Sequence, residues 1–349
     1  MLLIDGHLDL AMNALNWDRN LALDVYAIRQ AEAGMTEKGR ARGTVSLPEL
    51  RKAEVALCFA TVIDRTRHPG STSTGSACQE ISYAKAQGQL AYYRILEAEG
   101  KVRLLTDWPS LQAHLAAWPQ APVGIILSME GADPIVWPGQ VAKWWEDGLR
   151  VVSLSHYGRS AYAYGHDMEG GLTEAGRALL KEMEAIGMIL DVSHLAERAF
   201  WEALERFQGP VLASHNNCRV LVPGNRQFTD EQIRALIARQ GVIGVALDAW
   251  MLYPGWVRGE TFPSVVSLEA VADHIDHICQ LAGDANHAAI GSDLDGGYGT
   301  EQTPHDLDTI ADLQKVAPLL ARRGYSQEEI ARIFHGNWLA LLERAWARR

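Results

Sequence analysis

Histidines and acidic residues stand in short motifs that follow runs of apolar residues. They are His7 and Asp9 in DGHLD, Glu130 in SMEG, His156 in SLSH, His194 in DVSH, His215 in ASH and Asp293 in GSDLDG. Imidazole and carboxylate groups are ligands that suit zinc and similar divalent ions. Two such ions about 3.5–4 Å apart can share one carboxylate. The residue types therefore indicate a metal-dependent hydrolase, provided that the fold brings them together.

The apolar runs before these motifs are predicted to be strands. Eight runs are found, at residues 2–4, 53–62, 123–128, 150–154, 187–192, 211–213, 241–247 and 287–291. Most are continuously apolar, as expected of parallel strands that are covered on both sides. Helical patterns lie between them, for example at residues 172–186, 196–207, 229–239 and 268–281. Thr229 followed by Gln232 is a capping-box pattern that predicts the start of one helix.

Eight strands that alternate with helices predict a (β/α)₈ barrel of the TIM type. A length of 349 residues fits one large barrel or two ordinary domains, and the alternation favours the barrel. No internal repeat or linker is visible, so we expect residues 1–349 to form a single domain with C-terminal helices. The carboxyl ends of the strands in such a barrel converge on one active site. The motif residues are therefore expected to be neighbours in space.

The spacing of the motifs indicates which residues would share an ion. His7 and Asp9 are two residues apart on a strand, hence on one face, and can bind one ion together. His194 and His215 follow adjacent strands and are expected to hold a second ion, with Glu130 as the bridge. Each motif alone also fits a structural role, such as a buried histidine that satisfies a hydrogen bond. The joint pattern at the strand ends favours a binuclear metal site.

Some further residues resemble site residues but favour other roles. His274 and His277 fall inside a predicted helix and are expected to pack or cap there. Cys218 is expected to be a buried free thiol. The four cysteines show no pairing pattern, which suits a reducing compartment. Residues 67–77 read as a loop on the catalytic face, either part of a lid or a solvated surface loop.

Composition and charge exclude several classes of partner. The net charge is −11 and the isoelectric point about 5.6, which argues against nucleic acid or an anionic membrane as a partner. No apolar stretch approaches the roughly 18 residues of a membrane span. The terminal sequences resemble neither a signal peptide nor a lipid-anchor signal. We therefore predict a cytoplasmic enzyme with a small-molecule substrate, and a homodimer is one option for its assembly.

The sequence resembles the membrane dipeptidase (renal dipeptidase) family of the amidohydrolase superfamily. The similar segments run in the family's order through nearly the whole chain. They are DGHLD, SMEG, GLRVVSLSH, GMILDVSH, ASHNN, NRQFTDEQ, VADHIDHICQLAG, IGSDLDGG and HGNWLALL. The resemblance implies a zinc-dependent dipeptidase with two metal ions that tolerates a D-residue at the C-terminal position.

The resemblance also implies a role for each site residue. The metal ligands would be His7, Asp9, Glu130, His194 and His215, paired as above. His156 would polarise the scissile carbonyl, Arg226 would bind the substrate's terminal carboxylate, and Asp293 would transfer the proton. In mechanistic terms, His156 is a donor for the oxyanion, Arg226 a bidentate fork and Asp293 a general acid–base.

Two departures and two rival functions accompany this interpretation. Leu8 stands where the family's first motif, HND, has asparagine, and a tyrosine-rich segment follows His156, which leaves the side-chain preference open. A related amide or lactone hydrolase could use the same metals on N-acyl amino acids or cyclic esters. A catalytically inactive metal-binding scaffold is the other rival, and the presence of all proposed catalytic groups disfavours it.

Overall fold

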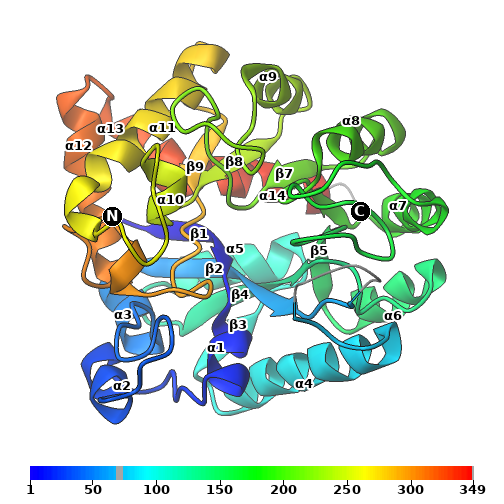
Figure 1. Cartoon of the computed structure of the whole chain (residues 1–349), viewed down its shortest axis with the longest axis horizontal. Helices are drawn as coiled ribbons and strands as arrows, with labels where there is room; N and C mark the ends of the chain where they lie inside the picture. The colour runs from blue at the N-terminus through cyan, green and yellow to red at the C-terminus, as the bar shows by residue number, and fades with distance from the viewer. Residues whose placement is uncertain (68–73, 348–349) are drawn as a thin grey trace.

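The computed structural model describes residues 1–67 and 74–347, and parallel strands form its centre (Figure 1). Eight strands are hydrogen-bonded in the order β1 (Leu3–Leu8), β2 (Val55–Ile63), β4 (Val123–Glu130), β5 (Leu149–Ser153), β6 (Ile189–Asp191), β7 (Val211–Ala213), β8 (Val242–Val245) and β9 (Ala288–Ile290). Contacts just beyond β9 meet β1, since Ser292 N donates to Asp5 Oδ1 at 2.8 Å and Asp293 N to His7 O at 3.2 Å. The predicted TIM-type barrel is confirmed.

Each of the eight predicted runs contains one strand of the barrel, but the boundaries differ. β1 extends beyond residue 4 to Leu8 because its later residues continue to pair with β2. β6 is shorter than predicted, because Ser193 N turns to the side chain of Asp191 instead of a neighbouring strand. A further strand, β3 (Val102–Leu104), pairs with β4 outside the ring and was not predicted. Its three residues are too few to show a pattern.

Helices surround the strands on the outside of the barrel (Figure 1). The α-helices of the described residues are α1 (Leu10–Asn16), α2 (Val25–Ala31), α3 (Leu47–Lys52), α4 (Gln79–Ala98), α5 (Trp108–Ala117), α6 (Val141–Glu146), α7 (Glu174–Ile186), α8 (Glu197–Arg206), α9 (Asp230–Ala238), α10 (Ala249–Leu252), α11 (Leu268–Ala282), α12 (Val316–Arg322), α13 (Gln327–Ala331) and α14 (Asn337–Trp346). The four predicted helices are α7, α8, α9 and α11. The capping box is confirmed: Gln232 N donates to Thr229 Oγ1 at 3.2 Å and Thr229 N to Gln232 Oε1 at 3.0 Å.

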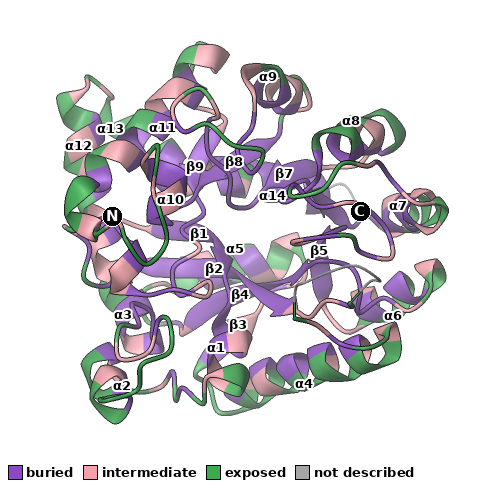
Figure 2. Ribbon diagram, viewed as in Figure 1, coloured by how far each residue is buried: buried purple, intermediate pink, exposed green. Residues whose placement is uncertain are grey.

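Helix α14 closes the amino-terminal end of the barrel. Asn337 Nδ2 donates to Ala288 O at the start of β9, and Arg344 Nη2 donates to Gln240 O just before β8. Trp338 packs with inward-facing residues of the strands, and its Nε1 donates to Ile290 O at 3.0 Å. The eight strands of the ring are buried except for the partly buried Ile63 at the end of β2, whereas the outer helices and the loops carry the exposed residues (Figure 2). Only the carboxyl ends of the strands are therefore left to form a site.

The remaining sequence predictions can be placed on this frame. Cys218 is buried and free, and its backbone N donates to His274 Nδ1 at 3.0 Å, while His277 Nε2 lies 2.8 Å from Asp230 Oδ1. Both histidines pack within the helical layer, as expected. Of the predicted loop 67–77, residues 68–73 lie outside the described residues, so its role stays a prediction. None of the described helices has the length and apolar composition needed to cross a membrane.

Close backbone packing at Ser214, just after β7, requires glycine within β8 and just after β9. A Cβ atom added to Gly291 would lie 1.7 Å from Ser214 O, and one added to Gly244 would lie 2.1 Å from the same oxygen. Both contacts are far below van der Waals distance and involve backbone, which cannot turn aside as a side chain can. Glycine at these positions therefore allows the end of β7 to approach its neighbours.

We expect Gly291→Ala to lower the free energy of unfolding by about 1–3 kcal/mol, because the added methyl group forces the strands apart. Gly88 provides the matched control, since it lies exposed inside α4 with no atom within 4 Å of an added Cβ. Gly88→Ala should raise the free energy of unfolding by roughly 0.5–1 kcal/mol through helix propensity. Urea unfolding measures both; a Gly291→Ala protein as stable as the parent would contradict the packing argument.

Candidate metal centre

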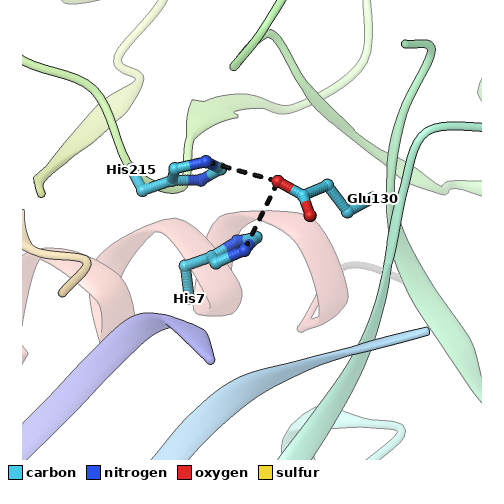
Figure 3. Close-up of side chains that lie close together, drawn as sticks. All are labelled: His7, Glu130 and His215. Atoms are coloured by element: carbon cyan, nitrogen blue, oxygen red, sulfur yellow. Dashed lines mark ion pairs between the residues drawn. The ribbon is translucent and has the colours of Figure 1, made fainter. Parts of the chain in front are cut away.

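Four histidines and one glutamate meet at the carboxyl end of the barrel. Glu130, the last residue of β4, places Oε1 at the centre, and Figure 3 shows His7 and His215 pointing toward it. The Nε2 atoms lie at 3.1 Å for His194, 3.3 Å for His215, 3.5 Å for His7 and 3.7 Å for His156. These side chains come from β1, β4 and the segments after β5, β6 and β7. The expected convergence of strand ends therefore occurs.

Two aspartates extend this cluster on the side of β1. His7 Nε2 lies 3.7 Å from Asp9 Oδ1 and 3.9 Å from Asp293 Oδ1. Potential ligand atoms of three sets lie within 4.8 Å of one another: His7, Glu130 and His215; Glu130, His156 and His194; and His7, Asp9 and Asp293. The structure thus brings together all seven motif residues, in sets that overlap at His7 and Glu130. Overlapping sets are the arrangement expected for two neighbouring ions.

Two further buried carboxylates, which the sequence analysis missed, hold the strand ends in place. Asp5 Oδ1 accepts from His7 N at 3.1 Å and Ser292 N at 2.8 Å. Asp191 Oδ1 accepts from Ser193 N at 2.9 Å and Ser214 N at 3.1 Å. Each carboxylate therefore ties together two segments that carry site residues. The signal was present, since each aspartate precedes a histidine within its own motif, in DGH and DVSH.

The backbone is strained at two of the site residues. His194 has φ 66° and Asp293 has φ 56°, both in the left-handed region. Such a conformation costs non-glycine residues on the order of 1–3 kcal/mol and persists only where the surroundings enforce it. Asp293 and Asp295 therefore do not continue a strand, which ends at Ile290, and they point to different partners. Asp295 accepts from Thr44 N at 2.8 Å, away from the cluster.

Burial sets the charge states around Glu130. Burial, with the charge of Arg226 adding to it, lowers the pKa of His7 to about 3, and burial lowers the pKa of His194 and His215 well below its usual range. Burial and the nearby carboxylate of Asp9 raise the pKa of Glu130 and Asp293 well above their usual range. The histidines are thus neutral bases with free lone pairs. The carboxylates repel one another unless a cation lies between them.

The donor set fits divalent metal ions. His7 Nε2 is buried and has no hydrogen-bond partner among the described residues. The Nε2 atoms of His194 and His215 lie 2.8 Å apart, although their rings are neutral bases that would each offer a lone pair there. Nitrogen and carboxylate oxygen in such a mixture suit zinc-like ions.

A cavity of about 580 Å³ opens over the cluster. Arg226 lies buried in the wall of this cavity. Its Nη2 donates to His215 O at 2.7 Å and lies 3.2 Å from His194 Nε2. Its Nη1 donates to Asn216 Oδ1. Burial lowers the pKa of Arg226 from its usual value. The wall also contains residues that the sequence analysis did not single out: Lys38, Arg65, Tyr157, Asp248, Trp250 and Arg258. All but Trp250, which lies in the short helix α10, are on loops, where no periodicity marks them.

A parallel barrel whose strand ends converge on buried histidines and carboxylates presents a candidate site for two metal ions. Residues 1–348 match the sequence profile of the family described as membrane dipeptidase, peptidase family M19. The chain belongs to this family. The resemblance in the sequence motifs is confirmed.

Sequence relatives share either part or nearly all of the chain. An uncharacterised protein in the pqqA 5′ region of Klebsiella pneumoniae is 34% identical over 180 residues, which are 52% of this chain and 63% of that protein. The dipeptidase aclJ of Aspergillus oryzae is 25% identical over 355 residues, covering 97% of this chain and 77% of its own. The chain thus spans less than two thirds of the length of the first of these relatives.

Solved structures share the fold over the full length. The crystal structure of dipeptidase AC, a metallopeptidase of family M19, has a TM-score of 0.81 at 23% identity and covers 99% of both chains. A metallopeptidase from Rhodobacter sphaeroides, liganded with a phosphinate mimic of the dipeptide L-Ala-D-Ala, has a TM-score of 0.82 at 22% identity and also covers 99% of both. At these identities the comparison supports the barrel architecture.

We expect chelation of bound metal to lower the melting temperature by several degrees, because the buried carboxylates then lose their counter-charge. An ion at a hundred times its dissociation constant contributes about 2.7 kcal/mol. Adding zinc back should restore the melting temperature, followed by scanning fluorimetry. Glu130→Gln, which removes the central ligand charge, should show a smaller rise with zinc. An equal rise in both proteins would place the stabilising ion elsewhere.

Proposed function

We propose that the protein hydrolyses the amide bond of dipeptides with two zinc ions at this cluster, and that it accepts a D-residue at the C-terminal position. The observation that carries this proposal is the convergence of histidine Nε2 atoms from separate strand ends on one oxygen of Glu130. Membership of the M19 family supports the reaction. The whole chain, residues 1–349, would act as one domain.

The proposed ligand roles follow the contacts in the cluster. His7 and Asp9 would hold one ion, His194 and His215 the other, and Glu130 would bridge them. His7 and Asp9 side chains lie 3.7 Å apart, and His194 and His215 lie 2.8 Å apart. When bound, the ions would polarise the scissile carbonyl and lower the pKa of water. Zinc is proposed because the set combines imidazole and carboxylate ligands.

The remaining residues would orient the dipeptide and move its proton. Arg226 offers a planar guanidinium in the cavity wall that can bind the substrate's terminal carboxylate. His156 would donate a hydrogen bond to the carbonyl oxygen as negative charge develops there. Asp293 would take a proton from the attacking water and return it to the leaving amine. Its raised pKa, caused by burial and by Asp9, suits a group that holds a proton during part of the cycle.

Tolerance of a D-residue rests on the shape of the site and on a relative. The cavity of about 580 Å³ falls within the usual range of small-ligand sites, about 300–1,000 Å³. The Rhodobacter sphaeroides metallopeptidase was crystallised with a mimic of L-Ala-D-Ala. A cavity of this size would accept either configuration of the second residue, provided that Arg226 still reaches its carboxylate.

Activity on a substrate panel tests this function directly. Zinc-loaded protein should hydrolyse L-Xaa-L-Xaa and L-Xaa-D-Xaa dipeptides, and should act less efficiently on N-acyl amino acids and lactones. Faster turnover of the acylated amino acids or lactones would replace the dipeptidase proposal with the related hydrolase. Inactivity on the whole panel, with two ions bound per chain, would favour the binding scaffold.

Asp293→Asn should reduce kcat by about 10²–10⁴, because asparagine is similar in size but cannot accept a proton. The variant should remain folded and keep at least one tightly bound ion. Asp295→Asn is the matched control, since Asp295 accepts from Thr44 N, Thr44 Oγ1 and Val45 N outside the cluster. It should reduce stability more than kcat. Steady-state kinetics measure kcat, and elemental analysis measures the metal content of each variant. A near-normal kcat in Asp293→Asn with unchanged metal content would show that Asp293 does not transfer the proton.

Arg226→Ala should lower kcat/KM for free dipeptides by an amount that corresponds to about 2–4 kcal/mol of lost transition-state stabilisation. This is the scale of losing a charged hydrogen-bond partner. Dipeptide amides lack the carboxylate and should lose much less. Metal content must be measured alongside, because Arg226 Nη2 lies 3.2 Å from His194 Nε2. Equal losses on dipeptides and their amides would show that Arg226 supports the metal centre instead of the substrate.

A further inference from the structure

The four imidazole rings around Glu130 make a similar contact through Nε2 but have different partners at Nδ1. Each presents Nε2 to Glu130 Oε1 within 3.1–3.7 Å. Distance alone therefore does not separate a metal ligand from a hydrogen-bond donor. The partner of the other ring nitrogen, Nδ1, decides where a neutral imidazole carries its single hydrogen.

At three of the histidines the Nδ1 partner leaves the imidazole free to bind metal through Nε2. Ser214 Oγ lies 3.2 Å from His7 Nδ1 and 2.8 Å from His215 Nδ1. A hydroxyl group accepts as well as donates, so Nδ1 can carry the hydrogen there. His194 Nδ1 has no hydrogen-bond partner among the described residues. Nothing in these contacts forces a hydrogen onto Nε2.

His156 is different because its Nδ1 faces a cation. Arg65 Nη1 lies 3.1 Å from His156 Nδ1. A guanidinium group has only donors and does not lose its proton in proteins, so Arg65 donates and Nδ1 accepts. The single hydrogen of the neutral ring must then sit on Nε2. We propose that Arg65 is a positioning residue that fixes His156 with its Nε2–H directed into the cavity.

This assignment separates His156 from the metal ligands. A nitrogen that carries hydrogen has no lone pair for an ion, so His156 is withheld from the centre although Glu130 and His194 lie within ligand distance of it. Its Nε2–H is instead available to an oxygen atom in the cavity, whose wall includes both Arg65 and His156. The use of that hydrogen on a substrate carbonyl rests on the proposed dipeptide hydrolysis, whereas its location does not.

Several contacts hold Arg65 in the required orientation. Its Nε donates to Thr74 O at 3.2 Å, and its own carbonyl accepts from Ser76 N at 2.7 Å. The guanidinium carbon lies 5.9 Å from the centre of the Tyr157 ring, within the range of a cation–π contact. Among the described residues Arg65 forms no ion pair with a carboxylate, and His156 Nδ1 is the side-chain acceptor that its guanidinium meets.

Nitrogen NMR of the zinc-loaded protein, labelled with ¹⁵N-histidine, tests the assignment without an activity measurement. The His156 signals are identified by their loss in His156→Gln. We expect a protonated Nε2 and an unprotonated Nδ1 in the parent. Arg65→Met should shift His156 toward the other tautomer, and Arg65→Lys, which keeps a cationic donor, should restore the parent pattern. Arg67→Met, an exposed residue of the same loop with the same charge, should leave the pattern unchanged.

Kinetics on dipeptides provide the second readout. Arg65→Met should lower kcat by roughly tenfold to a hundredfold with little change in KM, less than the 10²–10³ lost when such a donor is removed outright. Arg65→Lys should recover most of the loss. An unprotonated Nε2 in the parent, or an unchanged His156 spectrum in Arg65→Met, would overturn the proposal. A parent inactive on every dipeptide would instead reject the proposed function and leave the NMR result standing.

Discussion

The site depends on holding three carboxylates together in a buried space. Oxygen atoms of Asp9 and Asp293 lie within 4.8 Å of one another. His7 is a neighbour of both aspartates and also of Glu130. Two charges at this distance repel by about 3 kcal/mol at an effective dielectric constant near 20. Neutral histidines do not cancel that repulsion. A cation does, so the arrangement that is repulsive when empty favours the binding of a divalent ion.

The barrel meets this cost by fixing each carboxylate from a different strand. The backbone hydrogen bonds to Asp5 and Asp191 tie neighbouring strand ends together next to the clustered histidines. Glycines at 244 and 291 allow the end of β7 to sit close to its neighbours, which brings Ser214 between His7 and His215. The left-handed backbone at His194 and Asp293 is the strain that remains. The repulsion between the carboxylates is thus opposed by hydrogen bonds and packing contacts that extend well beyond the cluster.

Much of the fold and of the candidate site was predictable, because a parallel barrel requires a recognisable order of residues along the sequence. Buried strands read as continuous apolar runs, and the histidine and carboxylate motifs stand at the ends of those runs, so DVSH and ASH predict a candidate site from the sequence alone. Asp5 and Asp191 could have been predicted from the same motifs. Arg65 could not, because its contact with His156 joins two loops whose sequences carry no periodicity. The left-handed backbone of His194 was missed for a related reason, since tertiary contacts and not local propensity determine it. Strand β3 was missed because its three residues are too few to show a pattern.

Strand order also determines when the metal centre can exist. His7 lies in the first strand, Asp293 follows the last, and Trp338, which fills the interior from below, comes later still. A growing chain therefore carries its histidines and acids apart until the final strand is added, and contacts between such distant residues form late. Unlike a zinc finger, in which the ion organises a few adjacent residues, this protein must close its ring before the site is assembled. Metal ions bound as proposed would therefore enter only after Asp293 has been synthesised and the ring of strands has closed.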